Sequence, residues 1–367
     1  MIDRVNRVLC FFLCCLALTP LGCSENGRSD EPAFFFPIEA NGKWGVITQN
    51  GRIVVEPTFA DVARTNLHGL APRHVGGEAV LLLGDNEWYI VSQNGTTRMS
   101  PPAVYKTSEC IVENLGESMF AVYTEAEIFD PPARASTVID PLGKWKPTDD
   151  VKIHFEFSEG LVPIFHHGAF GFADRTGRVV IAPAFDEVDS FHEGLAAVQV
   201  DGKWGYIDRA GKLVIDTTFA SAVAFDSGRA RVLRGDGKSA ALINKAGEVV
   251  RDWPFADGVY RGGEFVDGLA PAPEQKTGFM GYLDLDLQWQ IRPMFYKAAE
   301  FSEGLAAVKR EGDPNWGYID RVGRIVIPVD DAIELRPFVY GLAWVKTSEG
   351  QGYINRTGGW VWQTSTR

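Results

Sequence analysis

The stretch from Phe191 to Ile215, FHEGLAAVQVDGKWGYIDRAGKLVI, decides the fold because a close copy of it occurs farther along the chain. The copy runs from Phe301 to Ile327 and reads FSEGLAAVKREGDPNWGYIDRVGRIVI. Both stretches share the FxEGLAAV opening, the WGYIDR block and the closing Val-Ile pair. Self-similarity at a fixed spacing is typical of repeat architectures. The body of the protein is therefore predicted to be an array of similar units.

Weaker copies extend this array in both directions, with successive openings about 34 to 40 residues apart. The pattern predicts repeats over residues 34–100 and 151–367, whereas residues 101–150 read as a degenerate repeat or an insert. Eight clear or partial units and one doubtful unit are expected. The weaker copies that open at a phenylalanine begin at Phe157, Phe225, Phe265 and Phe338.

Each unit has the residue pattern of short antiparallel strands. GLAAVQV alternates in polarity, and KWGYID and KLVI are rich in residues that suit a half-buried pleated surface. The segments Asp208–Gly211 and Asp320–Gly323 have Asp and Gly at the spacing of a type I turn followed by a left-handed residue. After Asp284 the expected glycine is Leu287, which predicts a looser or different turn there.

The pattern GKWGYIDxxGxxVIxPxF, followed by FxEGLAxV, resembles the WG-repeat (KWG-repeat) family, bacterial tandem β repeats named for a Trp-Gly pair. The resemblance covers nearly the whole chain after the N-terminal segment and is weak between residues 101 and 150. It implies an interaction module without an assigned partner. The pair stands here as Trp44-Gly45, Trp204-Gly205 and Trp316-Gly317.

The Trp of each pair is predicted to fill the contact between neighbouring units, as a residue at a fixed place in a repeat commonly does. The alternative is that these rings form a stacking platform for sugars or peptides. The Gly that follows is predicted to allow another backbone to approach closely.

These features predict an all-β fold in which tandem β-hairpin repeats of two or three strands form an open, solenoid-like array. About nine units exceed the ~4–8 blades of a typical propeller. A closed, β-propeller-like arrangement is the alternative.

The N-terminus has the pattern of an export signal. A short basic segment precedes an apolar run of 11 residues, Val8–Leu18, whereas a membrane span requires ~20. Leu21-Gly22-Cys23 follows and resembles the cleavage site of a bacterial lipoprotein. Residues 1–22 are therefore predicted to be a signal peptide, Cys23 a lipidated residue and residues 23–33 a tether. A plain secretory signal, with a periplasmic or secreted product, is the alternative.

The sequence contains no recognisable catalytic or metal-binding motif. GxSxG, a phosphate loop ending in GK[ST], HExxH and CxxC are all absent. His154, His166 and His167 cluster in sequence, but two adjacent residues of one strand point to opposite faces, which suits chelation poorly. Cys110 is interpreted as a small buried hydrophobe. Neither a metal nor a cofactor is predicted.

Charge and repetition together favour a binding function. The net charge of −12 and the pI of about 5.1 argue against a nucleic-acid partner. A repeated surface suits an extended partner that makes many modest contacts. We therefore expect a non-enzymatic lipoprotein of the cell envelope that binds a protein or a cell-wall polymer. The alternative is an envelope enzyme with its site in residues 101–150.

Overall fold

The residues that the computed structural model describes lie within Ala33–Arg367. The predicted signal peptide, Cys23 and the tether lie outside the described residues. The described residues are 34–63, 79–84, 87–100, 110–114, 119–124, 137–139, 152–153, 157–253, 265–274, 276–312 and 316–365.

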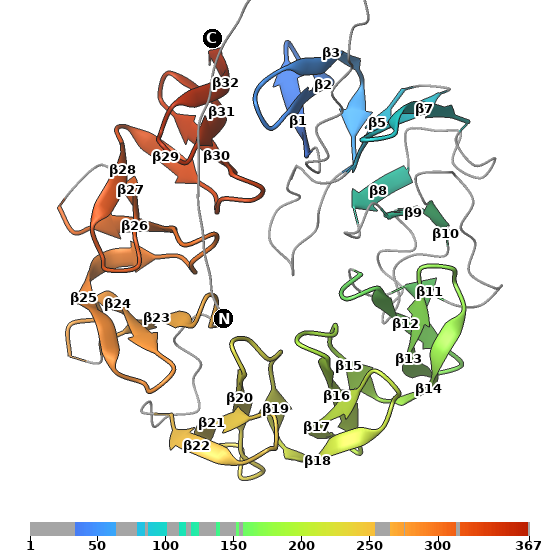
Figure 1. Cartoon of the computed structure of the whole chain (residues 1–367), viewed down its shortest axis with the longest axis vertical. Helices are drawn as coiled ribbons and strands as arrows, with labels where there is room; N and C mark the ends of the chain where they lie inside the picture. The colour runs from blue at the N-terminus through green and yellow to red at the C-terminus, as the bar shows by residue number, and fades with distance from the viewer. Residues whose placement is uncertain are drawn as a thin grey trace, which may run out of the picture. The chain divides into compact units, whose positions relative to one another are not determined.

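The described strands form nine successive units of antiparallel sheet, numbered here 1 to 9 (Figure 1). Unit 1 holds β1 (Phe35–Ala40), β2 (Lys43–Thr48) and β3 (Ile53–Phe59); unit 2 holds β4 (Asp61–Val62), β5 (Ala79–Leu83), β6 (Trp88–Ser92) and β7 (Gly95–Met99); unit 3 holds β8 (Cys110–Asn114), β9 (Phe120–Thr124) and β10 (Thr137–Ile139). Unit 4 holds β11 (Lys152–Ile153), β12 (Leu161–His166), β13 (Ala169–Asp174) and β14 (Val179–Phe185); unit 5 holds β15 (Glu187–Val188), β16 (Leu195–Val200), β17 (Lys203–Asp208) and β18 (Leu213–Phe219).

The remaining units follow the same order, except that one long strand is shared between two of them. Unit 6 holds β19 (Ser221–Ala222), β20 (Arg229–Leu233), β21 (Ala240–Asn244) and β22 (Val249–Asp252); unit 7 holds β23 (Leu269–Pro273), β24 (Met280–Asp284) and the start of β25 (Trp289–Ala298). Unit 8 holds the end of β25 with β26 (Ala306–Arg310), β27 (Trp316–Ile319) and β28 (Ile325–Val329); unit 9 holds β29 (Ala332–Leu335), β30 (Leu342–Thr347), β31 (Gly350–Asn355) and β32 (Trp360–Ser365).

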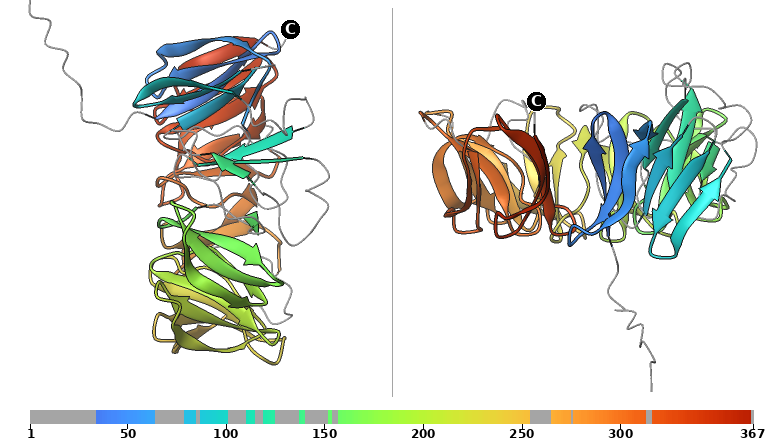
Figure 2. Two further views of the ribbon diagram at one scale, coloured as in Figure 1. Left: turned by 90° about the vertical axis from the view of Figure 1, so that its right-hand side faces the viewer. Right: turned by 90° about the horizontal axis from the view of Figure 1, so that it is seen from above.

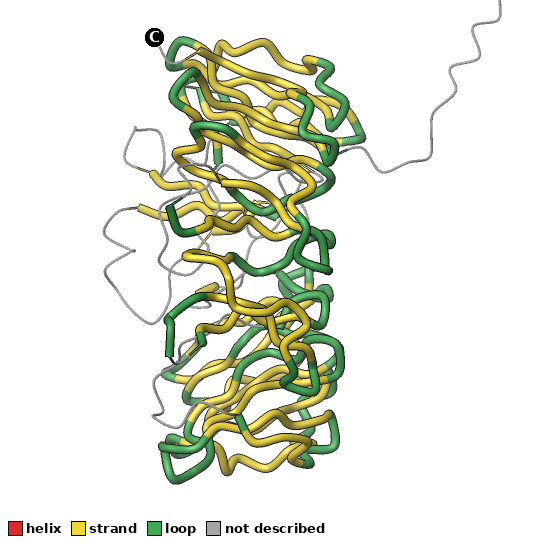
Figure 3. Tube along the Cα trace, turned by 90° about the vertical axis from the view of Figure 1, so that its left-hand side faces the viewer, coloured by secondary structure: helices red, strands yellow, loops and turns green. Residues whose placement is uncertain are grey.

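The all-β fold built from hairpin repeats is confirmed: the described part of the chain consists of strands and loops (Figure 3). The expected two or three strands per unit were too few for units 2, 4, 5 and 6, each of which has a fourth strand of two residues, and for unit 9, whose fourth strand has four residues. In unit 5 this strand is β15, which is separated from β14 by one residue and pairs with β16. Two residues are too short to give a recognisable sequence period. Among the residues that the structure describes, no helix has the length and hydropathy of a membrane span.

Strand register places two turns of each unit at the same end of its sheet. In unit 5, Leu195 at the start of β16 pairs with Asp208 at the end of β17. The turn that precedes β16 therefore lies beside the turn that follows β17. This arrangement brings the FxEGL and DRAG segments together, although they are separated in sequence.

Apolar side chains of successive units pack against each other, and Figure 2 shows the sheets of units 4 to 6 one behind another. Between units 5 and 6, the buried cluster includes Tyr206 and Ile215 from unit 5 and Phe225 and Ile243 from unit 6. The core of the protein is therefore a series of interfaces between sheets, as expected for a repeat array.

Unit 9 packs against unit 1, so the array has a contact between its last and first described units (Figure 1). The Tyr353 hydroxyl donates a hydrogen bond to the Pro37 carbonyl at 3.0 Å, and the Tyr353 ring lies edge-on to Phe36 at 5.3 Å. Phe34 stacks on Tyr340 with ring centroids 3.9 Å apart. Of the two arrangements predicted from the sequence, these contacts match the closed, propeller-like alternative.

Candidate functional site

The segment at the FxEGL position of units 4 to 9 forms a tight turn, which we call the acidic turn because its third residue is acidic in units 4, 5, 7 and 8. In unit 5 the backbones of His192 and Leu195 exchange hydrogen bonds of 2.9 and 3.1 Å. Glu193 (φ 53°) and Gly194 (φ 83°) lie between them with positive φ, as a type I′ turn requires. A non-glycine residue in this conformation costs about 1–2 kcal/mol. The recurrence of Glu here indicates that its side chain makes a compensating contact.

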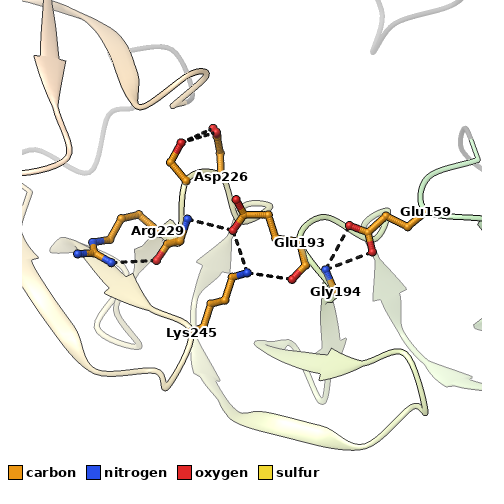
Figure 4. Close-up of polar contacts among 8 residues, drawn as sticks. Glu159, Glu193, Gly194, Asp226, Arg229 and Lys245 are labelled. Atoms are coloured by element: carbon orange, nitrogen blue, oxygen red, sulfur yellow. Dashed lines mark hydrogen bonds and ion pairs between the residues drawn. The ribbon is translucent and has the colours of Figure 1, made fainter. Parts of the chain in front are cut away.

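The carboxylate of one acidic turn accepts a hydrogen bond from the glycine N–H of the acidic turn in the next unit. Gly194 N–H donates to both carboxylate oxygens of Glu159 at 3.2 Å, and Gly228 N–H donates to Glu193 at 3.0 Å (Figure 4). These contacts link four of the five described junctions between units 4 and 9. The other two are Gly304 N–H to Asp267 at 3.0 Å and Gly341 N–H to Glu303 at 3.0 and 3.2 Å.

A basic side chain from the next unit completes this contact. Lys245 Nζ lies 3.1 Å from a carboxylate oxygen of Glu193 and donates to the Glu193 carbonyl at 3.0 Å. Burial works to raise the pKa of Glu193, but Lys245 and the Gly228 N–H outweigh it and lower that pKa below its ordinary value. The carboxylate is therefore ionised at neutral pH. Arg209 lies 3.3 Å from Glu159, and Arg356 lies 3.7 Å from Glu303.

A buried aromatic pair recurs at the same junctions. The ring of Tyr206 lies edge-on to Phe225, with centroids 4.8 Å apart, and the Tyr206 hydroxyl donates to the Val223 carbonyl at 2.8 Å. Burial, followed by the charge of Asp189, raises the pKa of Tyr206, so the hydroxyl stays protonated and can donate. Equivalent pairs are Phe172 with Phe191, Tyr282 with Phe301 and Tyr318 with Phe338, all at 4.8 Å.

The junction between units 6 and 7 departs from this pattern at several positions. Ser227 stands at the place of the acidic residue. By strand register, Arg229 and Arg231 stand where unit 5 has Leu195 and Ala197. Leu242 and Arg251 form the cross-strand pair that is Tyr206 and Ile215 in unit 5. Three arginines thus replace apolar side chains on the face of unit 6 toward unit 7.

A cavity of about 350 Å³ lies at this junction. Arg229 and Arg231 line it together with Phe265, the first described residue of unit 7. Arg229 Nη1 donates to the Gly228 carbonyl at 3.1 Å, whereas Arg229 Nε is buried and has no hydrogen-bond partner among the described residues. Burying an unsatisfied donor costs about 1–3 kcal/mol. The described residues therefore leave one donor of an arginine in the cavity lining without an acceptor.

Three carboxylates line the same cavity. They belong to Glu193, Asp226 and Asp267. Burial and the nearby charges of Glu193 and Asp267 raise the pKa of Asp226 above its ordinary value. A carboxyl group held in this way destabilises the fold when ionised, and such groups are common at functional sites. The cavity thus combines guanidinium donors with an acidic border.

The structure places the predicted Trp-Gly pairs at the junctions between units. Trp204 is partly buried and packs against the cluster between units 5 and 6, whereas Tyr206, two residues later, is fully buried. A Cβ on Gly205 would lie 2.4 Å from the Ile215 carbonyl oxygen, so the approach of β18 requires glycine here. Trp44 and Trp316 are also partly buried in junction clusters; Gly45 faces the same close approach at 2.5 Å, and Gly317 a looser one at 3.1 Å.

The predicted turn residues lie where β17 meets β18 and where β27 meets β28. Gly211 has φ 79° and donates its N–H to the Asp208 carbonyl at 2.9 Å; Gly323, with φ 85°, does the same to Asp320. The expectation of a looser turn after Asp284 is wrong. Leu287 adopts φ 57° and donates to the Asp284 carbonyl at 2.9 Å, so the repeat geometry imposes the turn on a leucine.

The predicted histidine cluster is only partly described. His154 lies outside the described residues. His166 ends β12 and His167 lies in the following turn with φ 51°, so their rings meet at 3.8 Å and do not point to opposite faces. Within the described ranges, no group of three His, Cys, Asp or Glu residues could hold a metal ion.

Residues 101–150 are described only in part. Residues 110–114, 120–124 and 137–139 form the three-stranded sheet of unit 3. Cys110 begins its first strand, and Phe120 is buried among apolar residues of unit 2.

Comparison with known proteins supports the repeat interpretation. The sequence model of the family described as "WG containing repeat" matches the chain at five positions, so the protein contains WG repeats. No curated protein matches the sequence. The matched segments are 44–72, 170–204, 204–238, 280–312 and 316–349.

Solved structures with a similar fold are β-propeller-like proteins. The chain is similar to the crystal structure of a eukaryotic initiation factor, with a TM-score of 0.53, 9% identity and coverage of 91% of this chain and 96% of that one. It also matches apo AztD from Citrobacter koseri (TM-score 0.39, 14% identity, 91% and 93% coverage) and Hsv2 from Kluyvelomyces marxianus (0.37, 13%, 66% and 88%). At these identities the likeness concerns the fold alone.

The sequence contained a signal for the cavity that the repeat pattern obscured. Aligned with its neighbours, FDSGRARVL at Phe225 has Ser for Glu, Arg for Leu and Arg for Ala. Each of these replacements is unremarkable in a diverged repeat. Only the strand register shows that Arg229, Arg231 and Arg251 share one face of unit 6.

Proposed function

We propose that the protein is a non-catalytic binding protein of the cell envelope, and that the cavity between units 6 and 7 contacts its partner. The observation that carries this proposal is that Arg229 and Arg231, at positions that are apolar in unit 5, line a cavity of about 350 Å³. Repeat positions elsewhere are apolar because they seal the junctions. Arginines at those positions weaken the packing between two units, and such a departure from the repeat is typical of a binding surface.

The partner group that suits Arg229 is a single acidic or carbonyl group of a protein or cell-wall polymer. Guanidinium groups bind carboxylates through directed, charge-assisted hydrogen bonds. The carboxylates of Glu193, Asp226 and Asp267 border the same cavity and would repel a polyanion. This border and the net charge of −12 both disfavour nucleic acid as the partner.

A binding role accounts for the cavity better than catalysis does. A general acid or base must be free to reach a substrate, whereas Glu193 is held by Lys245 and Gly228. The third arginine on this face of unit 6, Arg251, is likewise engaged, because its guanidinium lies 4.0 Å from the carboxylate of Asp286. The enzyme alternative, with a site in residues 101–150, predicts a turnover that one substitution in that segment removes while partner binding is retained.

Attachment to the envelope is the second part of the proposal. The Leu21-Gly22-Cys23 segment would be cleaved before Cys23, and the lipid on Cys23 would hold the protein at the membrane. Mass spectrometry of the exported protein should find an acylated N-terminal Cys23, and Cys23→Ala should abolish the modification. An unmodified N-terminus downstream of Cys23 would contradict the anchor and leave a soluble periplasmic or secreted protein.

Binding can be tested with the Arg229→Leu variant, which restores the residue found at this position in unit 5. The purified chain is mixed with insoluble cell-wall sacculi, and separately with soluble envelope proteins followed by crosslinking. We expect one of the two to bind, and Arg229→Leu to weaken that binding at least about tenfold. Arg310→Leu, which removes an exposed charge of unit 8, is the matched control. Equal binding by both variants, or no binding in either assay, contradicts the proposal.

A further inference from the structure

A second cavity lies at the contact between unit 9 and unit 1. Its volume is about 180 Å³, and aromatic side chains from both units line it. Trp44 comes from β2, Trp344 from β30 and Trp362 from β32, and all three are partly buried. Three indole rings therefore border one small space.

Unit 9 lacks the large cross-strand pair that unit 5 has at the equivalent place. In unit 5, Trp204 pairs with Phe219 across β17 and β18. The equivalent pair in unit 9 is Gln351 with Thr364. Trp362 pairs with the repeat tyrosine at a position that is isoleucine in units 4, 5, 7 and 8. Small side chains thus open the space, and an indole replaces an aliphatic wall.

Two polar side chains of the lining are available to a ligand. Glu39 and Gln351 form no side-chain hydrogen bond within the described part of the chain. Arg336 is already engaged, because its Nε donates to Glu334 at 2.9 Å and its guanidinium lies 4.8 Å from the Trp344 ring centroid. The cavity therefore offers a carboxylate and an amide, next to a cation whose charge is balanced.

We propose that this cavity binds one ring of a neutral carbohydrate, such as a hexose or N-acetylhexosamine residue of a polysaccharide. A pyranose ring has C–H groups on its faces and hydroxyl groups at its edge. The C–H faces can pack on the indole rings, and the hydroxyls can hydrogen-bond to Glu39 and Gln351. The volume lies below the ~300–1,000 Å³ of a drug-sized pocket, which suits a single ring of a longer chain.

An anionic ligand fits this cavity less well. A phosphate or an acidic sugar would meet the carboxylate of Glu39, and the nearby guanidinium of Arg336 is paired with Glu334. The inference goes beyond the proposed function, because none of these residues lines the cavity of units 6 and 7. The two cavities are tested with different probes and different variants.

The test is isothermal titration of the purified full chain with the β-1,4-linked trimer of N-acetylglucosamine and with the corresponding glucose trimer. We expect at least one trimer to bind, and Trp362→Ala to weaken that binding about tenfold or more. Gln351→Trp restores the repeat residue and fills the cavity. It should abolish binding without lowering the temperature of thermal unfolding. Trp360→Ala is the matched control, because Trp360 is 41% exposed and lies outside the lining.

Two results would overturn this inference. One is the absence of binding to either trimer at millimolar concentrations. The other is binding by Gln351→Trp that is as tight as that of the unaltered chain. If sacculi still bind through Arg229 in either case, the sugar site alone is refuted. If Trp362→Ala fails to fold, the Gln351→Trp result still decides.

Discussion

The junction between units 5 and 6 and the junction between units 6 and 7 are built from the same repeat, yet they differ in what fills them. The first contains a buried Tyr206–Phe225 pair and a carboxylate contact from Glu193 to Gly228. The second has arginines on the facing sheet and a cavity of about 350 Å³. One repeat can therefore give either a sealed interface or an open one, according to a few side chains that face the junction.

The largest difference between the two junctions should appear when a filling residue is removed. Tyr206→Ala should destabilise the protein by about 3–5 kcal/mol, because it leaves a cavity where a fully buried ring packs. Arg231→Ala, which gives unit 6 the alanine of unit 5, should change stability by less than about 1 kcal/mol. Urea unfolding measures both. Similar losses for the two variants would show that the junctions do not differ in packing.

Trp204→Ala sharpens this test within unit 5. Because Trp204 is only partly buried, Trp204→Ala should destabilise the protein less than Tyr206→Ala does. If Trp204→Ala destabilised the protein more than Tyr206→Ala, the tryptophan would be the main packing residue of the junction, as predicted from the sequence.

The glycine of the Trp-Gly pair offers a second contrast. In unit 5 the register shifts on both sides of Tyr206, and Ile215 O lies 2.4 Å from a Cβ at Gly205. In unit 6 the equivalent residue is Ala241, and the described register shifts only after Leu242. Gly205→Ala should therefore cost about 1–3 kcal/mol through overpacking, whereas Ala241→Gly should cost about 1 kcal/mol or less. If thermal unfolding showed a larger loss of stability for Ala241→Gly than for Gly205→Ala, the close approach of the β18 backbone would not explain the glycine.

The acidic turns give a pH-dependent contrast. Glu193→Gln should lower the free energy of unfolding by about 1 kcal/mol at pH 7. The effect is no larger because the carboxylate is partly exposed. Because the folded-state pKa of Glu193 is lowered, this contribution is fully present above the unfolded pKa of about 4.5 and disappears as pH falls through the folded pKa. Stability curves of the two proteins should therefore converge in acid. Curves that stay parallel down to low pH would show that the ionised carboxylate contributes nothing.

The reciprocal variant installs the missing acidic residue. Ser227 already has φ 50°, so Ser227→Glu adds no new backbone strain of the kind seen at Glu193. Its carboxylate could accept the Gly268 N–H and stabilise the junction of units 6 and 7 by about 1 kcal/mol. A destabilised variant at neutral pH would indicate that repulsion from Asp226 and Asp267 dominates.

The smallest expected effect concerns the turn after Asp284. Leu287→Gly should stabilise the protein by up to about 1 kcal/mol, because glycine adopts φ 57° without strain. Packing of Leu287 beside the Leu242–Phe265 cluster at the junction of units 6 and 7 opposes this gain. Calorimetric unfolding of this variant therefore measures whether backbone strain or packing dominates there.

The sequence predicted the features that recur and missed those that depend on pairing between distant strands. Repeated blocks such as WGYID and DRAG gave the all-β class, the turns and the need for glycine at Gly205. The two-residue strand β15 has no sequence period, so the fourth strand of the unit was not predicted. The closing contact of Tyr353 with Pro37 joins residues at opposite ends of the array, which the local pattern does not specify.

The candidate sites were missed for a related reason. Repeat analysis treats a departure from the consensus as divergence, whereas the two cavities consist of such departures. Arg229 and Gln351 each read as a poor match to the repeat. Their meaning becomes visible only when register places them beside other departures, as with Arg251 in unit 6 and Trp362 in unit 9.

Hydrogen exchange measured by mass spectrometry, with and without the partner, tests most directly whether function lies at the open junction of units 6 and 7. The purified chain is compared alone and with whichever probe binds in the assays with sacculi and envelope proteins. The backbone of Asp226–Arg231 should exchange more slowly when the partner is bound, and Ser158–Leu161 at the sealed junction of units 4 and 5 should not change. Protection of the sealed junction without protection of Asp226–Arg231 would contradict the account.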